Sequence, residues 1–201
     1  MVFADRLKDV ERAEYISSHS RKENAAEHCW HVLLLFYLME ENLPQHLDRY
    51  RVMKLLLIHD IVEIISGDVS AWDTKQRAAS VHKDRDAARA IANNPMFGSL
   101  SKSYEAVWDE FENGQNLEAI VARGIDRLQA AIQNLCANGK GLQKANVNRE
   151  KFQEAVRWVD KLPPSVRSQF KSIVEVLMNL EPWLLSGQST ISAETLAERM
   201  S

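Results

Sequence analysis

The sequence predicts an all-α fold, a compact bundle of about seven to eight helices. Only 7 Gly and 5 Pro interrupt the 201 residues, and this scarcity favours long helices over short strands joined by tight turns. Apolar residues recur at helical spacing along most of the chain, and no segment of useful length alternates between apolar and polar residues. The length corresponds to about one domain, enough to bury a hydrophobic core.

The first two long helices are expected at residues 24–41 and 48–66. Apolar side chains recur at helical spacing in the first segment, and Pro44 ends the pattern. The second segment is apolar almost all round in its latter half, which predicts a central, buried position. Gly67 follows it, as expected of a residue that ends a helix.

The rest of the chain continues the helical pattern. The segment 75–93 is charged and rich in Ala, and Asn93-Asn94-Pro95 ends it. Residues 139–148 are expected to form a loop. One domain is expected over residues 1–187, with residues 188–201 as a tail or short helix. Four further helices are expected, at 101–112, 117–137, 149–161 and 164–185.

Charge and composition exclude several classes of protein. The formal net charge is −3, and the chain lacks the Lys/Arg stripe of a nucleic-acid binder. Residues 1–6 lack the apolar core of a signal peptide, and the longest apolar run, 32–39, is too short to span a bilayer. We therefore expect a cytoplasmic protein that binds neither a nucleic acid polymer nor a membrane. Cys29 and Cys136 lie in apolar helical surroundings, so we expect buried free thiols.

His59 and Asp60 are polar residues inside the most apolar helical segment. They follow three Leu and an Ile and precede Ile61 and Val62. A buried carboxylate without a partner costs several kcal/mol, so the pair requires compensation. A divalent cation provides it, because His nitrogen and Asp oxygen are common metal ligands. A hydrogen-bonded His–Asp pair in the core would also satisfy the pattern, and this pair alone leaves both interpretations open.

Two other residues are candidates to join this pair. His28 lies on the apolar face of the helix expected at 24–41, so it points toward the core from a neighbouring element. His31 is a lower-ranked alternative one turn later. Asp126 stands at the edge of the apolar stripe of the helix expected at 117–137, where it is either a ligand or a surface residue paired with an Arg. Spacing alone does not decide between these roles.

Three motifs then appear in a fixed order. Residues 23–28 read E-N-x-x-E-H, residues 59–68 read H-D-x-x-E-x-x-x-G-D, and residues 126–129 read D-x-L-Q. Together with K-D-V-E-R at 8–12, they resemble the HD-domain metal-dependent phosphohydrolase superfamily, and within it the branch that contains the 5′-deoxynucleotidases. The resemblance covers about residues 5–135, and the combined pattern is far more specific than His-Asp alone.

The resemblance implies a role for each motif residue. It assigns the metal to His28, His59, Asp60 and Asp126. It implies that Glu63 positions or deprotonates the attacking water, as expected of a carboxylate beside a cation. Other residues are expected to contact the substrate: Asp68 at the nucleotide sugar, Arg12 elsewhere on the substrate, and Lys75, which follows the Asp73-Thr74 turn, at the phosphate.

The chain departs from the branch near Arg12. Relatives place a Trp one to three residues after this Arg, and here Tyr15 is the only aromatic residue available. We expect Tyr15 to pack against the sugar or base, and the substitution leaves the nucleotide preference open.

The resulting hypothesis is a phosphatase acting on nucleoside 5′-monophosphates, a small-molecule substrate. It requires one divalent ion, for which the mixed N/O ligands suit Co, Mn, Ni, Zn or Fe. The alternatives are a nucleotide-binding regulator without turnover and a hydrolase of another nucleotide phosphate ester. The 5 Trp residues, which include Trp158 and Trp183, exceed what a small core needs, and we expect a homodimer.

Overall fold

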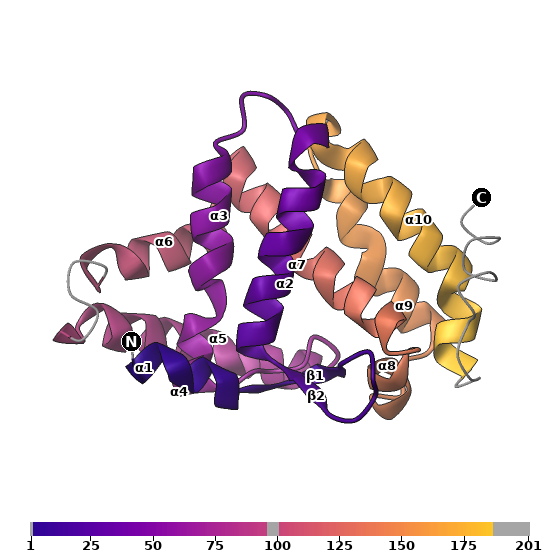
Figure 1. Ribbon diagram of the computed structural model, residues 1–201, viewed down its shortest axis with the longest axis horizontal. Helices are drawn as coiled ribbons and strands as arrows, with labels where there is room; N and C mark the ends of the chain where they lie inside the picture. Colours follow the sequence, from indigo (N-terminus) through magenta and orange to yellow (C-terminus); the bar gives the residue numbers. More distant parts are fainter. Residues whose placement is uncertain (1, 96–100, 187–201) are drawn as a thin grey trace.

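The structure is a computed structural model that describes residues 2–95 and 101–186. It is built almost entirely of helices (Figure 1). The expected tail at 188–201 lies outside the described residues. The α-helices are α1 (Val2–Asp5), α2 (Ala25–Met39), α3 (Arg49–Ile58), α4 (Glu63–Ser66), α5 (Thr74–Ala92), α6 (Ser101–Asn113), α7 (Leu117–Cys136), α8 (Lys140–Lys144), α9 (Arg149–Val156) and α10 (Pro164–Ser186).

Helix α7 is the centre of the bundle. It packs against α2, α3, α6 and α10, and Figure 1 shows it passing behind α2 and α3. Its inward face is fully buried at Val121, Ile125 and Leu128, which repeat at the spacing of one helix face. Any polar side chain next to this stripe is therefore held by a rigid, buried element. The all-α prediction is confirmed, and the seven predicted helical segments all contain helix.

The helix predicted at 48–66 is interrupted. Helix α3 ends at Ile58, a 3₁₀ turn (η3) covers His59–Val62, and α4 begins at Glu63. A 3₁₀ stretch inside a helical run often marks a functional position, and here it carries the His-Asp pair. Gly67 ends α4 as predicted: its φ is +78°, and its N–H donates to the Glu63 carbonyl oxygen.

A short antiparallel hairpin precedes α2, where no strand was predicted. Strand β1 (Glu11–Tyr15) pairs with β2 (Lys22–Asn24). Side chains alternate along β1, with Arg12 and Glu14 buried. A search for apolar–polar alternation misses this strand because its buried positions carry charged residues.

Smaller elements complete the chain. The remaining 3₁₀ segments are η1 (Arg6–Asp9), η2 (Glu40–Asn42) and η5 (Arg157–Lys161). Residues 139–148, predicted to be a loop, contain the short helix α8. Both thiols are free, and Cys29 is buried as expected. Cys136 is exposed, so the prediction that it is buried is wrong. Among the described helices, none has the length and apolarity to cross a bilayer.

Candidate metal centre

Three elements bring the four predicted ligands to one point. His28 comes from α2, His59 and Asp60 from η3, and Asp126 from α7. One ligand atom each from His28, His59 and Asp60 lie within 4.8 Å of one another. The Asp126 Oδ1 atom lies 3.0 Å from His28 Nε2 and 3.7 Å from His59 Nε2. The two carboxylate oxygens of Asp60 each lie near one imidazole. Oδ2 is 3.6 Å from His28 Nε2, and Oδ1 is 3.2 Å from His59 Nε2.

The hydrogen bonds of the two imidazoles leave their Nε2 lone pairs facing each other. His28 Nδ1–H donates to Gln129 Oε1 at 2.6 Å, and His59 Nδ1–H donates to the Leu56 carbonyl oxygen at 2.7 Å. In the neutral rings, both Nε2 atoms are then acceptors, only 3.3 Å apart. Asp60 and Asp126 add only further acceptors. A buried cluster of lone pairs needs a positive charge at its centre, and these donors fit a divalent cation.

The electrostatics of the cluster agree with this requirement. Burial lowers the pKa of His59, but the charges of Asp60 and Asp126 outweigh it and raise that pKa to about 9. Burial would raise the pKa of Asp126, but the neighbouring His28 and His59 imidazoles hold that pKa well below the usual range. The cluster therefore attracts positive charge, as metal sites do.

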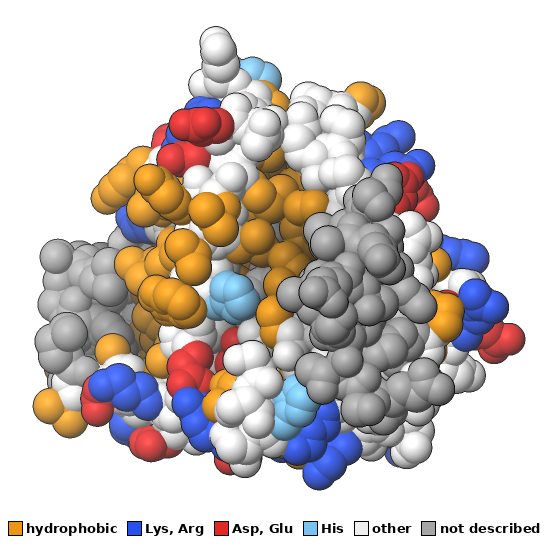
Figure 2. Space-filling view, turned by 45° about the vertical axis from the view of Figure 1, so that its right-hand side comes forward, with side chains coloured by type: hydrophobic (Ala, Val, Ile, Leu, Met, Phe, Trp, Pro, Cys, Tyr) orange, Lys and Arg blue, Asp and Glu red, His pale blue; other side chains and the backbone are white. Residues whose placement is uncertain are grey.

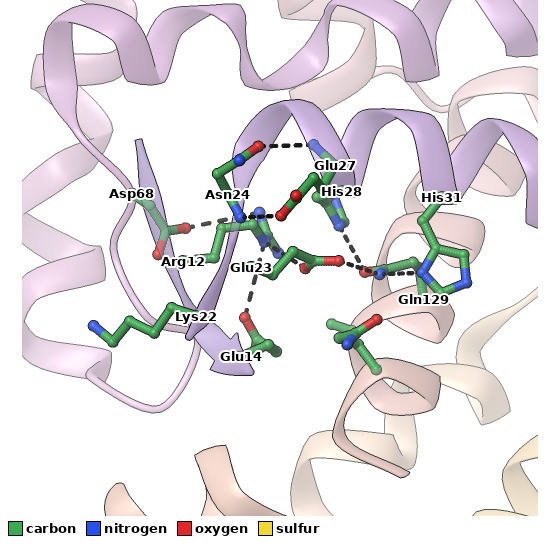
Figure 3. Close-up of polar contacts among 12 residues, drawn as sticks. Arg12, Glu14, Lys22, Glu23, Asn24, Glu27, His28, His31, Asp68 and Gln129 are labelled. Atoms are coloured by element: carbon green, nitrogen blue, oxygen red, sulfur yellow. Dashed lines mark hydrogen bonds and ion pairs between the residues drawn. The ribbon is translucent and has the colours of Figure 1, made fainter. Parts of the chain in front are cut away.

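Gln129 orients the first of these ligands. While its Oε1 accepts from His28, its Nε2 donates to Glu23 Oε1 at 3.1 Å and to His31 Nδ1 at 2.9 Å (Figure 3). His31, the lower-ranked candidate, thus reaches Gln129 rather than the cluster of His28, His59, Asp60 and Asp126. Such outer partners fix the tautomer and direction of a ligating His. The sequence analysis gave no role to Glu23 or Gln129. The only sign that they matter was their place in the motifs E-N-x-x-E-H and D-x-L-Q.

The remaining motif residues set the start of α2. Asn24 is the N-cap: its side chain accepts from the Glu27 N–H, and the Glu27 side chain accepts from the Asn24 N–H. This reciprocal capping box satisfies two free N–H groups of the first turn. Arg21 holds the Glu27 carboxylate with two nitrogens. His28 follows Glu27 directly, so the cap fixes the turn of α2 from which the His28 side chain projects.

Arg12 is a buried hub of charge. Its guanidinium donates to Asp60 Oδ2 at 3.1 Å and lies 3.8 Å from Asp68, 3.8 Å from Glu14 and 3.5 Å from Glu23. Figure 3 shows Arg12 among the last three carboxylates. Burial lowers the pKa of Arg12, but the charges of Asp60, Glu14 and Asp68 outweigh it and raise that pKa. Arg12 therefore orients Asp60 and balances the acidic residues around it.

Glu63 brings a further carboxylate to the cluster. Its Oε2 atom is buried and has no hydrogen-bond partner among the described residues. Burial raises the pKa of Glu63 well above the usual range, and Asp60 and Asp68 raise it further. Burial likewise raises the pKa of Asp68, with Arg12 acting against it. A buried carboxylate with an unpartnered oxygen beside this His/Asp cluster is a candidate acid or base.

A cavity of about 740 Å³ opens over the cluster. Its walls include the predicted residues Arg12, His59, Asp60, Glu63, Asp68 and Asp126. They also include residues that sequence reasoning missed, because their role depends on helix packing: Trp72, Arg77, Trp108, Glu112, Arg127 and Trp158.

Three of these additional residues shape the cavity beyond the cluster. Burial raises the pKa of Glu112, and the charge of Asp126 raises it further. On the α7 and η5 side, the Arg127 guanidinium lies 5.9 Å from the centroid of the Trp158 ring. The Phe170 ring packs against this indole in a T-shaped arrangement, with the ring centroids 5.8 Å apart.

Tyr15 and Lys75 are not brought to this cavity. Tyr15 lies on the opposite face of β1 from Arg12 and Glu14, where Lys140 Nζ is 4.3 Å from its ring centroid. Lys75 is exposed in the first turn of α5 and is not among the lining residues. The same turn instead supplies Arg77 to the cavity. The aromatic residues that line the cavity include Trp72, Trp108 and Trp158 instead.

Comparisons with known proteins point to one family. The profile of the family described as "HD domain" matches residues 4–164. Among curated proteins, 5′-deoxynucleotidase HDDC2 of Danio rerio is 25% identical over 134 residues, which cover 66% of this chain and 65% of that protein. The Homo sapiens HDDC2 is 23% identical over 128 residues, covering 63% and 61%. The matched region thus spans less than two thirds of the length of these relatives.

Solved structures agree with the fold. The crystal structure of a predicted metal-dependent phosphohydrolase from Magnetospirillum magnetotacticum MS-1 superposes with a TM-score of 0.73 at 30% identity, covering 88% of both chains. A conserved hypothetical protein from Pyrococcus furiosus gives a TM-score of 0.64 at 20% identity, covering 88% of this chain and 95% of that one. The second similarity concerns the fold alone.

Proposed function

The chain belongs to the HD domain family, and on that premise we propose that it is a metal-dependent phosphomonoesterase acting on nucleoside 5′-monophosphates, including deoxynucleotides. One observation carries the proposal. Two imidazole lone pairs and two carboxylates converge beside the unpartnered Glu63, on the wall of a cavity of about 740 Å³. A cavity of that size accommodates a nucleotide-sized ligand.

We assign His28, His59, Asp60 and Asp126 as the ligands of one divalent ion. When bound, this ion would lower the pKa of a water molecule and polarise the phosphate of the substrate. The donors are nitrogen and oxygen without thiolate, which suits Co, Mn, Ni, Zn or Fe. The 30% identity with the predicted metal-dependent phosphohydrolase from Magnetospirillum magnetotacticum MS-1 supports the presence of a metal.

Glu63 is assigned as the general base. Its buried Oε2 has no hydrogen-bond partner among the described residues, so it is free to accept one from the attacking water. A carboxylate whose pKa is raised takes a proton more readily than an ordinary carboxylate. The same group then carries the proton toward the departing 5′-oxygen. Glu63 is therefore expected to act on the chemical step rather than on metal binding.

The cavity walls suggest how the nucleoside lies. Asp68 borders the cavity beside Arg12, where a carboxylate can accept a hydrogen bond from a sugar hydroxyl. The Trp158 and Arg127 pair offers a flat aromatic and cationic surface to the base. Arg77, which also lines the cavity, is a candidate contact for the phosphate.

The test is phosphate release from a panel of 5′-deoxy- and 5′-ribonucleoside monophosphates. Metal-stripped protein receives Co²⁺ or Mn²⁺, and Glu63→Gln serves as the matched control that keeps the ligands. Metal-dependent release from deoxynucleotides by the wild type, lost in the variant, is the expected result. A protein that binds nucleotide and metal but releases no phosphate would instead be a regulator, and release only from another phosphate ester would redirect the substrate class.

A further inference from the structure

The cavity over the His/Asp cluster has an apolar end beside α8 and α9. Hydrophobic side chains also gather on an outer face of the molecule (Figure 2), where α2 exposes Trp30 and Tyr37, but neither of these residues lines the cavity. The apolar end is lined instead by Leu142 of α8 and Phe152 of α9, both of which are buried. An enclosed apolar wall of this kind is typical of pockets that hold the ring of a small ligand.

The loop between α4 and α5 reaches this apolar end from the other side. Residues 67–72 all line the cavity. Asp68, which we assigned to the sugar, lies at the start of the loop. Trp72, at its end, is half-buried and packs against the apolar cluster that contains Leu142 and Phe152. The loop therefore runs from the sugar contact to the apolar end, where Trp72 adds a flat wall.

One face of α7 joins the His/Asp cluster to the same end. Asp126, Ala130 and Asn134 all line the cavity, and residues four apart lie on one face of a helix. Asn134 follows Asp126 by eight residues, which corresponds to about 12 Å along the helix axis. Between them, Ala130 and Ala131 contribute only small side chains. A nucleotide with its phosphate at the cluster would therefore lay its base along this face and bring the far edge of the base to Asn134.

Asn134 carries an unpaired hydrogen-bond acceptor. The residue is only 4% exposed, and its Nδ2 donates to the Ala130 carbonyl oxygen at 2.9 Å. Because a carbonyl oxygen can only accept, this bond fixes which end of the amide is Oδ1. Oδ1 is buried and has no hydrogen-bond partner among the described residues. Gly141 leaves space beside it, since a Cβ at that position would lie 2.9 Å from Oδ1. A buried acceptor without a donor is costly, so it indicates a donor that a ligand supplies.

We propose that Asn134 selects the base of the nucleotide and favours the amino bases, adenine and cytosine. The inference rests on the proposed function, because it requires a nucleotide in the cavity. Oδ1 accepts a hydrogen bond from the exocyclic amino group of these bases. Hypoxanthine and uracil carry a carbonyl oxygen at the same position, so two acceptors would face each other in a buried place. Arg127 and Trp158 stack on any flat base, so they add affinity without making this choice.

The test compares nucleotides that differ in this one group. The quantity measured is kcat/KM for dAMP against dIMP and for dCMP against dUMP, with Co²⁺ or Mn²⁺ added to metal-stripped protein. Wild type is expected to favour the amino member of each pair about 10–100-fold, as an unpaired buried polar group implies. Asn134→Leu keeps the size of the side chain and is expected to bring both ratios close to one. Gln133→Leu removes the neighbouring buried amide, which does not line the cavity, and is expected to keep the wild-type ratios.

A second measurement leaves Asn134 in place and does not require hydrolysis. Titration calorimetry with the Co²⁺-loaded Glu63→Gln variant compares dAMP with 2′-deoxypurine riboside 5′-monophosphate, which has a hydrogen in place of the amino group. The analogue is expected to bind about 10–100-fold more weakly.

The outcomes separate this inference from the proposed function. Phosphate release with equal affinity for dAMP and the analogue, or with ratios that Asn134→Leu leaves unchanged, would overturn the role of Asn134 and leave the phosphatase standing. A preference for dAMP in binding, without phosphate release by wild type, would support Asn134 and overturn the phosphatase. A protein that binds no nucleotide would overturn both.

Discussion

Replacing Gln129 with Leu is expected to weaken metal binding without removing any ligand. The side chain is fully buried and makes hydrogen bonds to His28, Glu23 and His31. Leu has a similar size but leaves His28 Nδ1–H without its acceptor, so the imidazole loses both its tautomer and its direction. Loss of such an outer partner lowers metal affinity about 10–100-fold.

The same substitution also destabilises the metal-free protein. A buried polar group left without its partner costs about 1–3 kcal/mol, and three groups lose a partner here. Because such losses are not additive, we expect the free energy of unfolding to fall by about 3 kcal/mol. Urea denaturation in the presence of a chelator measures this change, and titration calorimetry with Co²⁺ measures the affinity.

Gln133→Leu is the matched control for this prediction. Gln133 lies one turn later on α7, is also buried, and donates through Nε2 to the Tyr15 carbonyl oxygen at 2.6 Å. It touches none of the assigned ligands, so its loss is expected to cost about 1 kcal/mol of stability and no metal affinity. Equal metal affinity in wild type and Gln129→Leu would refute the role given to Gln129.

Three further predictions follow from the site. Glu63→Gln is expected to lower kcat by about 10²–10⁴-fold while metal stoichiometry stays unchanged; full activity in a phosphate-release assay would contradict its role as base. Glu23 has its pKa raised by burial from 4.5 to about 7, so its stabilising contribution is present below pH 4.5 and is lost as the pH rises through 7. Relative to Glu23→Gln, wild type is therefore expected to lose about 3 kcal/mol over that range, and parallel unfolding curves with pH would contradict this. Arg127→Ala is expected to raise KM for nucleotides several-fold, as loss of a cation–π wall implies, and to leave kcat/KM for 2-deoxyribose 5-phosphate unchanged; equal effects on both substrates would contradict contact with the base.

The sequence predicts the helices well because they depend on local periodicity. The apolar stripe of Val121, Ile125 and Leu128 in α7 can be predicted from the sequence alone, and so can the end of a helix at Gly67. The gathering of His28, His59, Asp60 and Asp126 was implied by family resemblance rather than by spacing. The residues that hold them, above all Gln129, depend on which helix faces which, and that is a property of packing.

The missed strand β1 has a physical cause. The β1 strand was missed because burial of Arg12 and Glu14 reverses the usual polarity pattern, and ion pairs rather than apolar contacts compensate that burial. Tyr15 was expected near the substrate because relatives place a Trp close to this position, whereas the alternation of the strand turns it to the opposite face from Arg12. The break of the long helix at His59 has no Gly or Pro to signal it; the tertiary environment overrides local preference there.

The most direct measurement is the metal content of purified wild type and of single ligand variants, taken by mass spectrometry after equilibrium dialysis against Co²⁺ or Mn²⁺. We expect about one ion per chain in wild type, and near-complete loss of the ion in His59→Ala and Asp60→Asn while the circular dichroism spectrum stays unchanged. A wild type that binds no ion, or variants that retain a full equivalent, would contradict the assignment of these lone pairs to a metal.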